Sequence, residues 1–114
     1  MLYFEFQSYL EKIKMTAYLI VKSDTSNVNK KEFDDWYQTE HLIEAQEAFK
    51  SLSAKRAWIK DTKFHVAIYK FKNIRDAEKA ISSKNLEILI QKFDLKWDYK
   101  VKRTRELLDI AQGI

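Results

Sequence analysis

The chain has 114 residues, which is enough for one domain with a single hydrophobic core. It contains no cysteine, which excludes disulfides, thiolate nucleophiles and iron–sulfur clusters, and its one glycine is Gly113, which excludes a glycine-rich phosphate-binding loop. The formal net charge of +4, with 46% hydrophobic and 33% charged residues, is typical of a soluble globular protein.

The N-terminal segment is set apart from the rest of the chain by its pattern. Residues 1–14 lack the basic start and apolar centre of a secretory signal, and no run approaches the ~20 apolar residues of a membrane span. We therefore expect a cytoplasmic protein that does not enter a membrane. Met15 stands directly before a strand pattern, so we interpret residues 1–14 as an N-terminal extension and residues 15–114 as a single domain.

The first two elements are a predicted strand and a predicted helix. Residues 16–22, TAYLIVK, are a β-branched and aromatic run typical of a strand. A polar loop follows, and Asn29 with Glu32 three residues later predicts a capped helix start. The helix is expected from about Lys30 to Lys50. Its apolar stripe consists of Phe33, Tyr37, His41, Ala45, Ala48 and Leu52.

The rest of the chain predicts a hairpin, a broken helix and a last strand. Residues 53–60 and 63–71 are two strand patterns joined by a tight connection. A helix opens at Asn73, breaks near Ser82–Asn85 and continues for a further turn or two, and the last strand is expected at 97–107. This order, β-α-β-β-α-β, predicts an α+β, ferredoxin-like fold with a four-stranded antiparallel sheet.

Both faces of the predicted sheet are apolar. On the strand at 63–71 the two sets are Phe64, Val66 and Ile68 on one face, and His65, Ala67, Tyr69 and Phe71 on the other. This topology places both helices on one face, so one chain cannot cover the other. We predict that a second copy covers it, sheet against sheet about a two-fold axis, and we assign the face of His65 to this dimer side. The alternative is that residues 1–14 fold over the open face.

A motif on the first helix resembles a known family. The motif W-Y-x-x-E-H-L at 36–42, in a chain of this element order, resembles the dimeric α/β-barrel superfamily. More narrowly, it is similar to the EthD-like and antibiotic-biosynthesis-monooxygenase-like groups, in which such a helix faces a cleft against the sheet. The likeness covers residues 16–107, and it departs from the family at Ile43, where a proline is often found.

The resemblance implies a homodimer with a pocket for a small organic molecule between the first helix and the sheet. Described members of the superfamily include cofactor-free oxygenases, haem-degrading enzymes and isomerases. No haem-ligand or flavin signature is present in this sequence, so we expect no cofactor.

His41 is the candidate catalytic residue. It lies on the stripe that faces the sheet, and an imidazole with a pKa of about 6.5 can accept a proton near neutral pH. In one interpretation it is the base of a cofactor-independent oxygenase or isomerase and deprotonates a phenol or enol. In the other it is a core residue bonded to a backbone carbonyl. Glu40 points roughly 100° away from His41 on the helix and is therefore a poor hydrogen-bond partner for it.

The expected pocket residues are Trp36, Tyr37, Tyr18, Arg56, Trp58 and Tyr69.

The sequence offers two further candidate sites, one for an anion and one for a metal ion. Arg56 could hold an anionic substrate group through a bidentate contact, although a solvated strand charge is the simpler interpretation. His41 and His65 lie on different elements without a third ligand, so we predict no tightly bound metal.

The basic segment near the C-terminus suggests a different class of function. It contains Lys96, Lys100, Lys102, Arg103 and Arg105. The RNA-recognition motif has the same element order, and basic residues interleaved with Trp97 and Tyr99 suit RNA, so an RNA-binding domain is the alternative function. The acidic first helix and the absence of glycine from residues 63–71 argue against nucleic acid. A non-catalytic ligand-binding or regulatory dimer is the third hypothesis.

Overall fold

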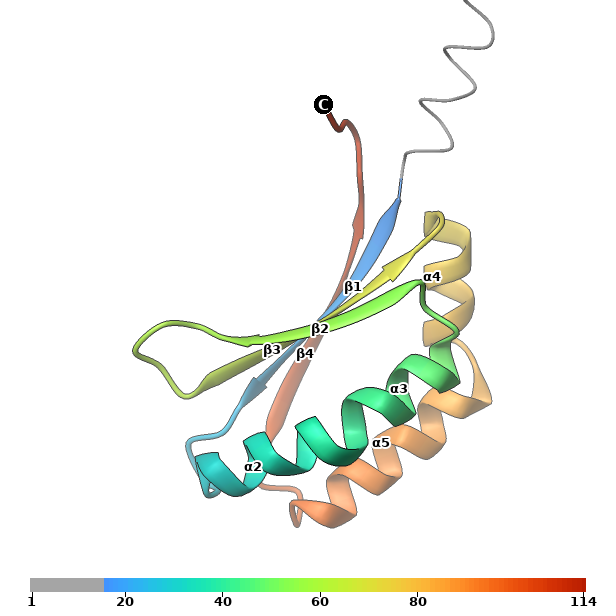
Figure 1. Cartoon of the computed structure of the whole chain (residues 1–114). Helices are drawn as coiled ribbons and strands as arrows, with labels where there is room; N and C mark the ends of the chain where they lie inside the picture. Colours follow the sequence, from blue (N-terminus) through green and yellow to red (C-terminus); the bar gives the residue numbers. More distant parts are fainter. Residues whose placement is uncertain (1–15) are drawn as a thin grey trace, which may run out of the picture.

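The computed structural model describes residues 16–114, so the expected extension at 1–14 lies outside the described residues. Four strands form an antiparallel sheet in the order β2-β3-β1-β4, and the helices pack on one face of it (Figure 1). The predicted α+β, ferredoxin-like fold is confirmed. The elements are β1 (Ala17–Asp24), α2 (Lys30–Trp36), η1 (Tyr37–His41), α3 (Leu42–Phe49), β2 (Ser53–Trp58), β3 (Phe64–Phe71), α4 (Ile74–Ile81), α5 (Lys84–Lys96) and β4 (Lys102–Asp109).

Side-chain caps fix the starts of the helices. The Asn29 side chain accepts a hydrogen bond from the Glu32 backbone N–H at 2.9 Å, as the capping pattern predicted. The Asn73 side chain caps α4 in the same way, and the Ser83 hydroxyl caps α5. The break predicted near Ser82–Asn85 is therefore confirmed, because α4 ends and α5 begins there.

The last strand starts later than predicted. Residues 97–107 were expected to form it, but α5 extends to a C-cap at Trp97, and a turn follows in which Asp98 and Tyr99 have positive φ angles. The reason is tertiary: burial of one face of α5 outweighs the strand propensity of Trp97 and Tyr99. The buried residues on that face, including the cap, are Leu86, Leu89, Phe93 and Trp97.

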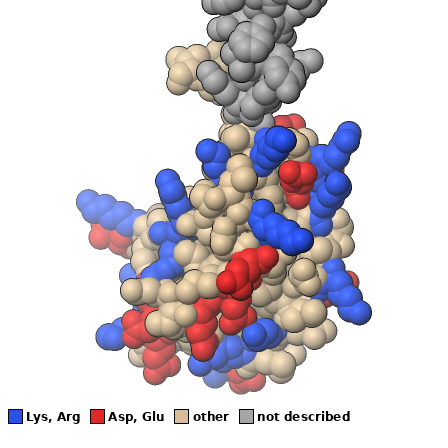
Figure 2. Space-filling view, turned by 45° about the vertical axis from the view of Figure 1, so that its right-hand side comes forward, with Lys and Arg blue, Asp and Glu red and all other residues tan. Residues whose placement is uncertain are grey.

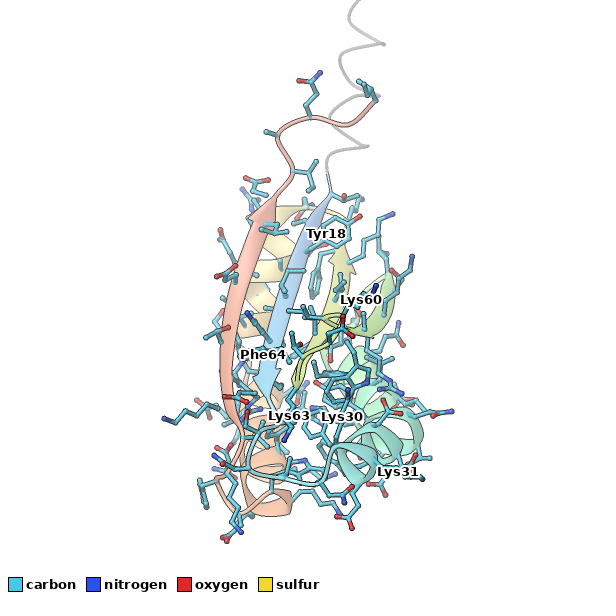
Figure 3. The ribbon with its side chains drawn as sticks, turned by 90° about the vertical axis from the view of Figure 1, so that its left-hand side faces the viewer. Tyr18, Lys30, Lys31, Lys60, Lys63 and Phe64 are labelled. Atoms are coloured by element: carbon cyan, nitrogen blue, oxygen red, sulfur yellow. The ribbon has the colours of Figure 1, made fainter. Side chains whose placement is uncertain are left out.

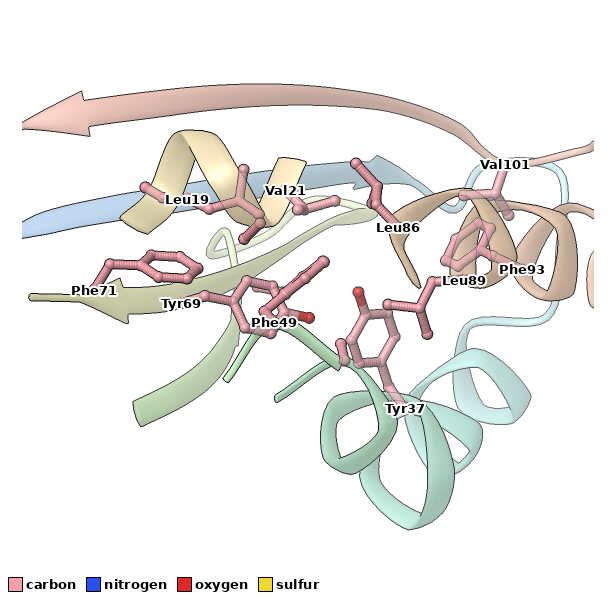
Figure 4. Packing of buried hydrophobic residues seen from close by; sticks show 14 of the residues in the cluster. Leu19, Val21, Tyr37, Phe49, Tyr69, Phe71, Leu86, Leu89, Phe93 and Val101 are labelled. Atoms are coloured by element: carbon pink, nitrogen blue, oxygen red, sulfur yellow. The ribbon is translucent and has the colours of Figure 1, made fainter. Parts of the chain in front are cut away.

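Strand alternation divides the sheet residues between two faces. Leu19 pairs with Tyr69 on β3 and Leu107 on β4, and this set lies under the helices in the main core (Figure 4). The assignment of the His65 face to the dimer side was wrong. His65 is 0% exposed beneath the helices. Since both faces are apolar, the sequence pattern does not reveal which one the helices cover.

The other face of the sheet is not covered by any helix of the described residues (Figure 3). Leu108 on β4, which pairs with Tyr18, is exposed on this face. The apolar residues that β1 and β3 place there are only half-buried in the single chain, and they are Tyr18, Ile20, Phe64, Val66 and Ile68. We refer to this set as the open-face residues. No helix within residues 16–114 is both long and apolar enough to cross a membrane.

The first helix contains a wide π-helical turn. Its buried residues recur at every fourth position, namely Phe33, Tyr37, His41, Ala45 and Phe49. In an α-helix this spacing drifts by about 40° per step, or roughly 160° over the whole set. The turn η1, in which the Leu42 N–H donates to the Tyr37 carbonyl, absorbs part of that drift and keeps the set facing the sheet. Leu52, which the prediction placed on the stripe, is instead 62% exposed.

Candidate functional site

A small cavity lies between the first helix, α5 and the sheet. Its volume is about 20 Å³, room for about one water molecule. The polar residues on its wall are Tyr37, His41, Tyr69, Arg103 and Arg105. The rest of the wall is apolar and includes Phe49, Leu86 and Leu89, which surround the hydroxyls of Tyr37 and Tyr69 (Figure 4).

His41 enters this wall from the end of the π-helical turn. It is 6% exposed and stacks on the Trp36 ring, with 4.5 Å between ring centroids and 16° between ring planes. Tyr37 and Phe93 meet it edge-on at 4.8 and 5.4 Å. Trp36 and His41 are five residues apart and would point roughly 140° apart in an α-helix. The wide turn therefore makes the stack possible.

The environment of His41 keeps the imidazole neutral. Burial lowers the pKa of His41 to about 4, and the positive charge of Arg103 acts in the same direction while Glu44 opposes it. At neutral pH one ring nitrogen therefore has a free lone pair that can accept a proton or a hydrogen bond.

Two tyrosine hydroxyls face the same space. Burial raises the pKa of Tyr37 to about 12, although hydrogen bonding with Tyr69 and the nearby Arg103 oppose this. Burial also raises the pKa of Tyr69 well above its usual value. Both phenols are protonated at neutral pH, and since their mutual hydrogen bond uses one of the two O–H groups, the other is able to donate to a ligand oxygen.

Arg103 and Arg105 come from β4, where they lie two residues apart and therefore on the same, helix-covered face. The Arg103 side chain is 9% exposed; its Nη2 donates to Asp94 Oδ1 at 2.7 Å, and its guanidinium lies 3.6 Å from the centre of the Phe93 ring. Arg105 is exposed and forms no ion pair or side-chain hydrogen bond with any residue of 16–114.

Sequence reasoning missed these two arginines as site residues because it treated the basic segment as one patch. The strand divides that patch: Lys102 lies on the open face, while Arg103 and Arg105 face the helices. A signal was present, since Val101 and Leu107 have the same alternation and are apolar. Over the helices, acidic and basic side chains are interspersed (Figure 2).

The predicted pocket residues separate into four groups, of which Arg56 and Trp58 are the last. Tyr37 and Tyr69 line the cavity, and Trp36 stacks on His41 without lining it. Tyr18 lies on the open face, because it alternates with Leu19, so the structure removes it from the pocket.

Arg56 and Trp58 form a separate polar contact. Arg56 Nη1 and Trp58 Nε1 both donate to Asp34 Oδ1, at 2.7 and 2.8 Å. These bonds lower the pKa of Asp34 and connect α2 to β2. Arg56 is therefore neither a solvated charge nor a free anion-binding group.

His65 is buried beside the site and does not line the cavity. Its ring contacts those of Phe33, Tyr37 and Trp58, and neither ring nitrogen has a hydrogen-bond partner within residues 16–114. Burial lowers its pKa to about 4. The described part of the chain contains no group of three or more histidine, cysteine or acidic residues arranged to hold a metal ion.

Comparison with known proteins gives structural matches alone. No protein-family model matches the chain, and no curated protein is similar in sequence. A variant of SnoaB, a cofactor-independent oxygenase from Streptomyces nogalater, superimposes with a TM-score of 0.64 at 9% identity, covering 87% of this chain and 96% of its own. An EthD-family protein from Bacillus halodurans gives 0.65 at 16% identity, covering 88% and 100%.

A dimeric ferredoxin-like protein from an uncultured marine organism gives a TM-score of 0.65 at 15% identity, covering 89% of this chain and 100% of its own. The chain has the ferredoxin-like fold of these proteins. The resemblance expected from the first-helix motif is thus confirmed at the level of fold. At sequence identities this low, structural similarity shows a common fold but does not show a common reaction.

Proposed function

We propose that the protein binds a small organic molecule in the cavity beside His41, and that His41 is the base of a cofactor-independent oxygenase or isomerase reaction. The observation that carries the proposal is a neutral, buried imidazole on one wall with two protonated tyrosines and two arginines. The common fold with a cofactor-independent oxygenase supports it. Since the cavity holds about one water molecule, an organic ligand fits only if the cavity widens on binding.

The chemistry begins with proton transfer. His41 takes a proton from an acidic C–H or O–H, and the resulting anion lies near the arginines and tyrosine hydroxyls. An imidazole with a pKa of about 4 is a weak base in the empty site, but an adjacent substrate anion stabilises the imidazolium and raises that pKa. In an isomerase, the proton returns to a different atom of the same anion.

In an oxygenase, O₂ is the oxidant and co-substrate. The carbanion adds to O₂ and forms a peroxide anion with a new C–O bond. The proton held by His41 passes to that peroxide, and loss of water leaves a carbonyl where the substrate had a CH₂ group. The chain supplies the base, the groups that stabilise the anion and a site that excludes water.

The test is His41→Gln, with Glu40→Gln as the matched control because Glu40 is the exposed neighbour on the same turn. We expect His41→Gln to slow deuterium exchange at the acidic C–H of 1,3-diketones, and O₂ consumption with polyphenols, by at least about 100-fold. Circular dichroism checks that each variant is folded. Wild-type rates in a folded His41→Gln variant contradict the proposal, and loss of the fold supports the core interpretation of His41.

We also infer that the active form is a homodimer, as the half-buried open-face residues need a cover that the described chain lacks. A neighbour in fold is described as a dimeric ferredoxin-like protein, which supports this inference. Packing two such faces together would bury the apolar residues of both copies and build the dimeric α/β barrel.

A further inference from the structure

The charges around the cavity do not balance. At neutral pH His41, Tyr37 and Tyr69 are uncharged, and Arg103 is compensated by Asp94. Arg105 has no carboxylate partner within residues 16–114. Among the described residues, the cavity wall therefore has one positive charge without a carboxylate partner.

The two arginines are held in different ways. Arg103 is fixed by its ion pair with Asp94, by the Phe93 ring beneath it and by burial. Arg105 is exposed, with its backbone roughly 7 Å further along β4, and no ion pair or side-chain hydrogen bond from residues 16–114 restrains its guanidinium. Arg103 is therefore a structural part of the wall, whereas Arg105 is available to turn toward a ligand at the mouth of the cavity.

We propose that the ligand of this cavity is a mono-anion, a carboxylate or the conjugate base of an acidic enol or phenol, and that Arg105 binds its charge. The inference rests on the proposed function and specifies its substrate class. A planar guanidinium donates two parallel hydrogen bonds to a carboxylate, or N–H groups to the single oxygen of an enolate or phenolate, and the bonded pair of Tyr37 and Tyr69 supplies a hydroxyl donor as well. The uncharged part of the ligand lies against the apolar residues of α3 and α5.

The test compares benzoate with benzamide, which have the same shape but differ in charge, by NMR titration of the full chain at pH 7. We expect benzoate to shift the His41 ring signals and to bind at least tenfold more tightly than benzamide. Arg105→Gln removes that preference, and Arg105→Lys restores part of it. Lys102→Gln, which removes the same charge from the open face of the same strand, leaves the preference unchanged.

The outcomes separate this inference from the proposed function. Equal affinity of the wild-type protein for the two compounds, with shifts at His41, overturns the anion preference and leaves the pocket in place. Wild-type benzoate affinity in Arg105→Gln overturns the role of Arg105. Failure of both compounds to bind at millimolar concentration contradicts the pocket itself, and the inference fails with it.

Discussion

The rings of His41 and His65 both pack against that of Tyr37, with centroids 4.8 and 4.3 Å from it, yet they differ in their access to the cavity. His41 reaches the cavity wall, whereas His65 is enclosed by aromatic rings and has no hydrogen-bond partner in the described residues. A buried histidine next to a candidate site is thus not by itself a site residue. Access to the cavity distinguishes the two.

Both imidazoles make stability depend on pH. The charged groups that affect them most are Arg103, Glu44 and Lys92 for His41, and Arg56 and Asp34 for His65. Each pKa is about 4 in the folded protein and about 6.5 in the unfolded chain, so between these values the unfolded chain binds more protons. Stability is therefore lost as pH falls from about 6.5 to 4, by roughly 3 kcal/mol per histidine at full effect.

Urea unfolding of the wild type and of His65→Leu, at pH 7 and pH 4.5, checks this prediction. We expect His65→Leu to lose about half of the pH-dependent change, because one of two similar groups is removed. An undiminished pH-dependent change in the variant would show that His65 is not held neutral by burial.

At the scale of elements, the sequence predicted correctly those features that depend on neighbouring residues. It did not predict those that depend on packing between distant segments. Asn29 and Asn73 identify helix starts because a cap depends on a few neighbouring residues. The end of α5 depends on packing of Trp97 against distant residues, which no local window contains. The wide turn left a signal in the strict four-residue spacing from Phe33 to Phe49, which was treated as an ordinary helical stripe.

The end of α3 offers a test of backbone strain. Lys50 is its C-cap and has a φ of 55°, in the left-handed region that favours glycine. We expect Lys50→Gly to raise the free energy of unfolding by about 1 kcal/mol, because the side chain is exposed and the strain is relieved. Lys50→Ala, which removes the same charge without relieving φ, is the control in urea unfolding. Equal stability of the two variants would contradict the explanation.

At the scale of the whole molecule, element order and alternation were enough to predict the fold, with one sheet face that no helix of residues 16–114 covers. They were not enough to choose the face, because β1 and β3 are apolar on both sides and the choice depends on how the helices cross the sheet. Because the covered face could not be chosen, Tyr18 was wrongly predicted to lie in the pocket and His65 at the interface. The arginines of β4 were missed for a related reason, since their side of the strand decides their role.

The proposed dimer is tested by a charge on the open face. We expect the wild-type protein to have twice the mass of one chain in light scattering, and Ile20→Glu to have the mass of one chain, because a carboxylate is costly to bury in an apolar interface. Gln91→Glu adds the same charge on the exposed side of α5 and should leave the mass unchanged. A wild-type monomer at micromolar concentration would remove the barrel architecture.

The π-helical turn also affects how this chain is compared with others. A helical wheel drawn through residues 30–49 with a single period puts its two halves out of phase, because the turn at 37–41 is wider than an α-helical one. Against a protein with an unbroken α-helix, the correct correspondence requires a one-residue gap within that turn. Without the gap, His41 is matched to a position on a different face of the other protein's helix, and the candidate base is missed in the comparison.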